Sequence, residues 1–101
     1  MSSPTFELDS SAEAEFYETV AYYKQFETTL YQDFIQDFDN TVQNLVSFPN
    51  AGQPYLLKTK RIFLRRFPFS IVYKIYKDEL IVAFAIMHMR RKPDYWATRI
   101  K

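Results

Sequence analysis

The hydrophobic period of the chain changes near residue 50, and this change constrains the fold more than any other feature. Before that point, apolar residues recur every three or four positions, which is typical of helices packed on one side. After it, apolar and β-branched residues come in short runs of strand length. The period therefore predicts an α+β domain in which a helical first half packs against a sheet built by the second half.

Two helices are expected in the first half of the chain. The first follows N-cap candidates at residues 9–11 and runs to about Phe26. The second follows Thr28 or Thr29 and ends at residues 48–54, where prolines and the only glycine indicate a turn. Together they should form a hairpin. The acidic residues of the second helix have no basic or nucleophilic neighbour in sequence, so we expect them to form a solvated face.

The remaining segments have the length and composition of strands. Residues 6–8 alternate before the first helix, and residues 61–66, 69–76 and 80–87 follow the hairpin, with a tight turn at residues 77–79. The order β-α-α-β-β-β predicts a mostly antiparallel sheet with the helical hairpin packed on one face.

Two further segments and the core complete the expected fold. Residues 55–60 should be a loop or an edge strand, and Pro93 should start a short C-terminal helix over residues 94–100. The length suits a single domain over residues 1–101 with one core between the helices and the sheet. The expected core residues are Phe16, Val20, Phe34, Phe38, Leu45, Val72, Ile75, Val82, Phe84 and Ile86.

The two halves carry opposite charge although the net charge is only +1. Residues 1–50 hold nine acidic and one basic side chain, for −8, whereas residues 51–101 hold three acidic and twelve basic side chains, for +9. This split predicts a basic face that meets nucleic acid or an acidic protein segment. The alternative is that the two halves neutralise each other within the fold.

Composition excludes several classes of protein. Without cysteine the chain forms no disulfide and no thiolate nucleophile, and with one histidine it forms no two-histidine metal site. No nucleotide- or metal-binding motif is present, so we expect no cofactor and no metal. The longest apolar run, residues 80–87, is too short for a membrane-spanning helix, which needs about 20 residues. Early acidic residues argue against a secretory signal, and we expect a cytoplasmic protein.

The first candidate functional residue is His88, at the end of the last expected strand. A lone histidine in this place can be a hydrogen-bonded structural residue. Alternatively, it exchanges protons near neutral pH while Arg90 and Arg91 hold phosphate, with Tyr95 as a second proton-transfer group.

The other candidates are basic and aromatic. Arg61, Arg65 and Arg66 are either a solvated strand face or a phosphate-binding set. Tyr95 and Trp96 can stack on a base or on an aromatic partner, although a terminal helix usually docks one such ring on the core. We expect Trp96 to be the ring that docks.

The order of the elements, together with two segments, resembles the RelE/ParE toxin family. One segment is residues 67–73, Phe-Pro-Phe-Ser-Ile-Val-Tyr, and the other is the ending from His88 to Trp96. The resemblance covers almost the whole chain. It implies a RelE-like fold and the toxin half of a bacterial type II toxin–antitoxin module, which inhibits growth and is neutralised by a small antitoxin with an acidic, disordered tail.

The resemblance implies one of two mechanisms. RelE-like members cut mRNA on the ribosome without a metal, and by position the catalytic residues would then be His88, Arg90 and Tyr95. ParE-like members bind DNA gyrase. Ser70 stands three residues before Tyr73, where RelE has an arginine, and this difference favours ParE-like action. A family member that only binds a partner is the third alternative. In each case the residues expected to contact a partner or nucleic acid are Arg61, Arg65, Arg66, Arg90, Arg91 and Trp96.

Overall fold

The structure is a computed structural model that describes residues 4–26 and 29–100. Within these residues it contains two α-helices, five strands and three short 3-10 helices. In chain order the elements are β1 (Thr5–Leu8), α1 (Ser10–Lys24), α2 (Leu30–Ser47), β2 (Gln53–Pro54), η1 (Leu56–Lys58), β3 (Lys60–Phe63), β4 (Phe69–Tyr76), η2 (Lys77–Glu79), β5 (Leu80–His88) and η3 (Ala97–Arg99).

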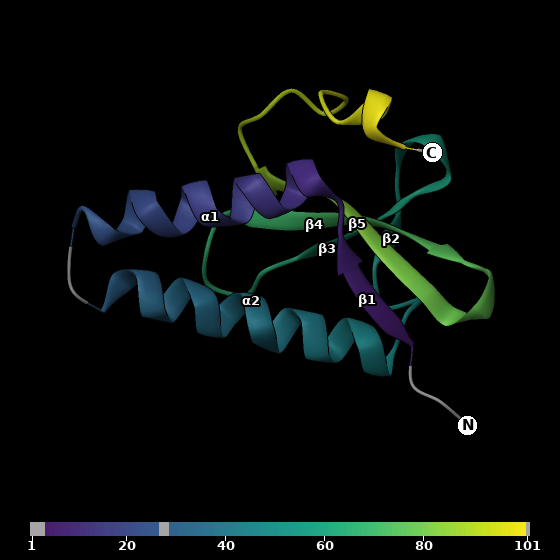
Figure 1. Cartoon of the computed structure of the whole chain (residues 1–101), viewed down its shortest axis with the longest axis horizontal. Coiled ribbons are helices and arrows are strands. Elements are labelled where there is room, and N and C mark those ends of the chain that lie inside the picture. The colour runs from purple at the N-terminus through teal and green to yellow at the C-terminus, as the bar shows by residue number, and fades with distance from the viewer. Residues whose placement is uncertain (1–3, 27–28, 101) are drawn as a thin grey trace.

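The five strands form one mixed sheet in the order β1-β5-β4-β3-β2. β1 pairs in parallel with β5, and the other three pairs are antiparallel. α1 and α2 lie side by side as a hairpin, and the chain after β5 runs beyond α1 on the side away from α2 (Figure 1). The predicted α+β fold with a helical hairpin packed on the sheet is therefore confirmed. β2 adds a two-residue edge strand just before the segment expected to be a loop or an edge strand.

Only one of the two helices begins with a side-chain cap. The Asp9 carboxylate accepts a hydrogen bond of 3.1 Å from the backbone N–H of Ser11, which satisfies a free donor at the start of α1. Thr29 precedes α2 without such a bond, and Thr28 lies outside the described residues. Helix α2 is therefore positioned mainly by its apolar face, as most helices in proteins are.

A bulge in β5 divides the hydrophobic residues between the two faces of the sheet. Val72 is paired with Ala85 and Tyr73 with Ala83, so Phe84 has no partner in β4. The extra residue changes the phase of alternation, and as a result Ala83 and Ile86 both face the helices although they are three positions apart.

The expectation of one shared core is therefore partly wrong. Seven of the expected residues belong to or pack against the cluster between helices and sheet: Phe16, Val20, Phe34, Phe38, Leu45, Ile75 and Ile86. Val72 lies instead in a second cluster on the opposite face, while Val82 and Phe84 line a groove beside β1. In β5 the bulge is the physical reason, because its extra residue separates Ile86 from the face of Val82 and cannot be read from apolar periodicity. In β4 ordinary alternation puts Val72 on the face opposite Ile71 and Tyr73.

The second cluster is covered by the end of the chain. Trp96 is fully buried there against Val72, Ala85 and Met87. The expected helix over residues 94–100 is reduced to the single 3-10 turn Ala97–Arg99. Backbone bonds in this segment join residues three apart, and so short a segment cannot supply the cooperative bonds that an α-helix needs.

The turn between α2 and β2 is anchored by Tyr73. The fully buried Tyr73 hydroxyl donates a hydrogen bond of 2.7 Å to the Pro49 carbonyl and accepts one of 3.0 Å from the Gly52 N–H. A Cβ atom at Gly52 would stand 2.6 Å from that hydroxyl oxygen, so the close approach requires glycine. Tyr73 is therefore a structural residue of this turn.

No helix within residues 4–26 and 29–100 combines the length and apolar character needed to cross a membrane.

The core predicts the effect of shortening a buried ring on α2. Phe38→Ala removes a side chain that is 6% exposed and should lower the free energy of unfolding by about 3–5 kcal/mol. Phe48→Ala, at a ring that is 65% exposed just after the same helix, should change it by less than about 0.5 kcal/mol. Urea denaturation of both variants measures the difference, and equal stabilities would show that α2 does not pack as described.

Candidate functional site

Strand order brings most of the expected basic residues to one end of the sheet. β4 is antiparallel to both β3 and β5, so the end of β3, the start of β4 and the end of β5 lie together. Arg65 and Arg66 stand in the β3–β4 connection, and Arg90 and Arg91 follow β5; all four are exposed. We refer to these four arginines as the basic end.

The β3–β4 connection is held by a buried acid of α2. Asp37 is 4% exposed, and its carboxylate accepts hydrogen bonds from the backbone N–H groups of Arg65, Arg66 and Phe67 at 3.2, 2.8 and 3.1 Å. The expectation that the acidic residues of α2 form a solvated face is wrong for Asp37. These bonds also explain why β3 ends at Phe63 rather than at residue 66, because the three N–H groups bond the carboxylate instead of a strand.

Arg61 lies in β3, and its side chain is held on the face of the sheet opposite the helices, where it is paired with Val72. Its Nε donates a hydrogen bond of 3.0 Å to the Ser70 hydroxyl. Its guanidinium lies over the rings of Tyr55 and Phe63, at 4.8 and 4.6 Å from their centroids. The structure thus gives Arg61 a fixed position separate from the basic end.

A cavity of about 470 Å³ opens between α1 and the end of β5. It combines acidic, basic and aromatic side chains, so it suits a polar ligand with an aromatic or apolar part. Its lining residues are Glu15, Glu18, Thr19, Tyr22, Tyr23, Phe69, Ile86, His88 and Arg91.

His88 is the last residue of β5, and its ring is held by two contacts. Its ring packs edge-on against Phe69, with 5.0 Å between the centroids. Its Nδ1 accepts a hydrogen bond of 3.0 Å from the backbone N–H of Arg90. This bond leaves Nε2 as the nitrogen available for chemistry or binding.

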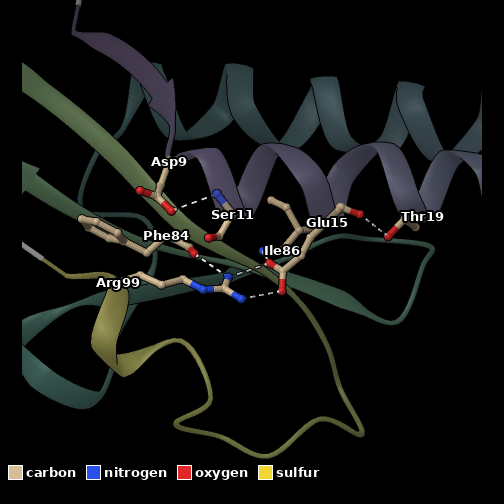
Figure 2. Close-up of polar contacts among 7 residues, drawn as sticks. All are labelled: Asp9, Ser11, Glu15, Thr19, Phe84, Ile86 and Arg99. Carbon is tan, nitrogen blue, oxygen red and sulfur yellow. Dashed lines mark hydrogen bonds and ion pairs between the residues drawn. The ribbon is translucent and has the colours of Figure 1, made fainter.

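The C-terminal segment is fastened by an ion pair between Glu15 and Arg99 (Figure 2). Arg99 donates to both carboxylate oxygens of Glu15, at 3.0 and 3.2 Å, and also to the Phe84 carbonyl at 3.0 Å. Glu15 accepts a further bond of 3.0 Å from the Ile86 N–H. Burial lowers the pKa of Arg99, but the hydrogen bonds and charge of Glu15 outweigh it and raise the pKa overall.

Tyr95 and Trp96 are both directed inward. The indole of Trp96 is fully buried, so the docking that we expected is confirmed. The expected contact of Trp96 with a partner stays a prediction. The Tyr95 hydroxyl is buried beside Glu15 without a well-formed hydrogen bond among the described residues. Burial raises the pKa of that hydroxyl well above its usual value, the charge of Glu15 raises it further, and Arg91 and Arg99 oppose the shift.

The structure brings together some of the expected site residues and separates others. His88 and Arg91 line the same cavity, and Arg91 also lies over the Tyr95 ring at 3.9 Å. Arg61 and the Tyr95 hydroxyl face elsewhere. Arg90 precedes Arg91 in the sequence; its side chain is exposed and is not among those that line the cavity.

Sequence reasoning missed the roles of two acids. Glu15 lies at helical spacing from the buried Ala12 and Thr19, and Asp37 lies at the same spacing from Phe34 and Thr41. This spacing places both carboxylates on the inner faces of their helices, and it is the signal from which the sequence could have predicted their burial. The partners of Asp37, and Ile86 among those of Glu15, are backbone N–H groups, which no residue type identifies in the sequence, and the Arg99 side chain is 84 residues away from Glu15.

A family model and two solved structures are similar to this chain. The chain matches the family described as ParE toxin of type II toxin-antitoxin system, parDE, over residues 6–93. A structure of the chromosomal ParDE system from P. aeruginosa aligns with a TM-score of 0.75 and 21% identity, covering 86% of this chain and 97% of that one. A free double arginine-to-alanine variant of the E. coli toxin RelE aligns with a TM-score of 0.63 and 13% identity, covering 99% and 100%. No curated protein is significantly similar in sequence.

The buried Tyr95 hydroxyl predicts a pH dependence. Because its pKa is raised in the folded state, stability is complete below the unfolded value of about 10 and falls as pH rises above it. Tyr95→Phe removes this loss and leaves no unpartnered hydroxyl, so the variant should be at least as stable at pH 7 and should lose less stability between about pH 9 and 11.

Urea denaturation at a series of pH values measures this effect, with Tyr17→Phe as the control at a ring that is 63% exposed. The raised pKa values of Tyr23 and Tyr73 are common to all the proteins compared, so the difference isolates Tyr95. Identical pH profiles for Tyr95→Phe and the parent chain would contradict the prediction.

Proposed function

The chain belongs to the ParE toxin family of type II toxin–antitoxin systems, and from this premise we propose that it inhibits growth by binding DNA gyrase through its basic end. In this proposal the protein acts in the cytoplasm, carries no catalytic site of its own and is neutralised by a cognate antitoxin. Arg65, Arg66, Arg90 and Arg91 supply the exposed charge for these contacts.

The single observation that supports binding over catalysis is the position of the Tyr95 hydroxyl. A general acid or base must come within about 2.6–3.2 Å of the proton it moves. The Tyr95 hydroxyl is buried at Glu15 beneath the guanidinium of Arg91, and its raised pKa keeps it protonated near neutral pH, so it does not act as a base there. A ribonuclease that used Tyr95 would first have to open the C-terminal segment.

The ribonuclease remains a second candidate, because His88 and Arg91 share one cavity. A histidine and an arginine that line one cavity can move a proton and hold a phosphate. Such an enzyme would use His88 without Tyr95. The two candidates therefore differ in what they require of the His88 side chain.

We predict that His88→Gln keeps most of the growth inhibition when it is expressed in bacteria. Glutamine is similar in size and can still form hydrogen bonds, but it cannot act as an acid or base, a loss that typically costs a catalyst about 10²–10⁴-fold. The double variant Arg90→Ala with Arg91→Ala should abolish inhibition while circular dichroism shows a folded protein. Lys58→Ala with Lys77→Ala, two exposed bases away from the basic end, is the matched control and should remain toxic.

Assays with purified components separate the two candidates. The parent protein should stop supercoiling by gyrase and leave mRNA intact on ribosomes. Loss of toxicity in a folded His88→Gln protein, together with mRNA fragments ending in 2′,3′-cyclic phosphate, would replace the gyrase proposal with the ribonuclease.

A further inference from the structure

The cavity between α1 and the end of β5 lies at the boundary between the acidic and the basic half of the chain. The helix contributes the carboxylates of Glu15 and Glu18 to its lining, whereas β5 and the segment after it contribute His88 and Arg91. The Glu15 carboxylate is already compensated by the side chain of Arg99 (Figure 2). The uncompensated charges of the cavity are therefore one negative group on α1 and one positive group beyond β5.

Three polar groups of the lining have bonding capacity that the fold does not use. Within the part of the chain that the structure describes, the Glu18 carboxylate has neither a hydrogen bond nor an ion pair, and it can only accept. The Arg91 guanidinium lies over the Tyr95 ring but reaches no described acid, so its donors remain available. His88 has a free Nε2. A ligand that satisfies all three carries donors at one end and an anion at the other.

Aromatic rings lie between these polar groups. Tyr23 and Phe69 line the cavity, and their edge-on contacts with Phe67 and His88, at 5.0 Å each, hold both rings in place. The Tyr22 ring also lines it and is 54% exposed. A volume of about 470 Å³ falls within the range of small-molecule sites, about 300–1,000 Å³. The cavity therefore suits a small molecule with a planar ring system, because such rings stack on aromatic side chains.

A nucleotide combines a planar base with an anion, and the carboxylate selects among the bases. Arginine binds phosphate with paired N–H donors, which fits Arg91. Guanine presents two adjacent donors on its Watson–Crick edge, N1–H and the N2 amino group, and these match the two oxygens of the Glu18 carboxylate. Adenine and cytosine present an amino group beside an acceptor nitrogen, and that acceptor repels a carboxylate. Glu18 therefore favours guanine.

We propose that the cavity between α1 and the end of β5 binds a free guanine nucleotide. Glu18 accepts hydrogen bonds from the edge of the base, Tyr22 stacks on its face, and Arg91 with the Nε2 of His88 holds the 5′-phosphate. No sequence motif identifies the site, because its residues come from segments at opposite ends of the chain. The proposal goes beyond the inhibition of gyrase and does not rest on it, since the ligand is a mononucleotide and no bond is formed or broken.

The test titrates the full chain with 5′-GMP by isothermal calorimetry and NMR. We expect a dissociation constant below about 1 mM, with the largest shift changes at Thr19 and His88. Guanosine lacks the phosphate and ribose 5-phosphate lacks the base, so each should bind at least about tenfold more weakly. AMP should bind about fivefold more weakly or less tightly still, because it loses a hydrogen bond at Glu18.

Substitution of Arg91 tests the phosphate contact. Arg91→Ala should weaken binding of GMP about tenfold or more and leave the binding of guanosine unchanged, because only the nucleotide carries the phosphate. Lys92→Ala is the matched control, since this exposed base is the next residue in the chain and does not line the cavity. This control should bind GMP like the parent.

Substitution of Glu18 tests the choice of base. Glu18→Gln should weaken binding of GMP about fivefold and remove the preference for GMP over AMP, because an amide both donates and accepts, as the adenine edge does. Glu13→Gln changes an exposed acid of the same helix outside the lining and should keep the preference. All four positions are exposed, so circular dichroism should show folded proteins.

Four results would overturn the proposal. They are no binding of GMP at about 10 mM, equal binding of AMP and GMP, equal losses in Arg91→Ala and Lys92→Ala, and a base preference that Glu18→Gln retains. Equal losses in the two basic variants would show attraction of the phosphate by surface charge alone. Every measurement is made without gyrase or RNA, so failure of the nucleotide site leaves the proposed function standing, and failure of gyrase inhibition leaves the nucleotide site standing.

Discussion

The carboxylate of Glu15 holds together three parts of the structure that the sheet alone would leave apart. β1 is paired with β5 only from Leu80 to Ala83, so the edge of β5 beyond that point lacks a strand neighbour. Glu15 reaches this edge from α1 by accepting the Ile86 N–H, and it also fixes the end of the chain through Arg99. Removal of one partner from a buried ion pair typically costs about 3–5 kcal/mol. The cavity beside His88 exists because Glu15, rather than another strand, closes this edge.

Asp37 plays the same physical part on the other helix. A buried carboxylate must be compensated, and Asp37 is compensated by three backbone N–H groups of a connection that has no regular structure. The β3–β4 connection is thereby ordered, and Arg65 and Arg66 project from a fixed backbone rather than from a loose loop. Asp37 thus supports irregular backbone at the end of the sheet where the exposed arginines gather, whereas Glu15 bonds a residue of strand β5 and the Arg99 side chain of the C-terminal segment.

The sequence predicts those parts of the fold that repeat a pattern over many residues. The bounds of α2 and β4 follow from the spacing of apolar residues and from the turn that holds Gly52, and the structure has them close to the expected positions. The bulge at Phe84 and the contacts of Glu15 are not predictable in this way. Glu15 and Ile86 are 71 residues apart, and a backbone N–H has no residue type that would identify it. For the candidate site, the sequence identifies His88, the arginines and the docking of Trp96, but not the burial of the Tyr95 hydroxyl, which depends on how the last residues cross the sheet.

The opposite charges of the two halves are only partly neutralised within the fold. Among the described residues the structure forms two ion pairs, and both join an acid of the first half to a base of the second. The pair of Arg66 with Asp33, at 4.0 Å and exposed, contributes little to stability. The pair of Arg99 with Glu15 is largely buried and neutralises one of the twelve basic side chains of the second half. Arg65, Arg90 and Arg91 therefore keep their charge at the surface, where only solvent or a partner can compensate it.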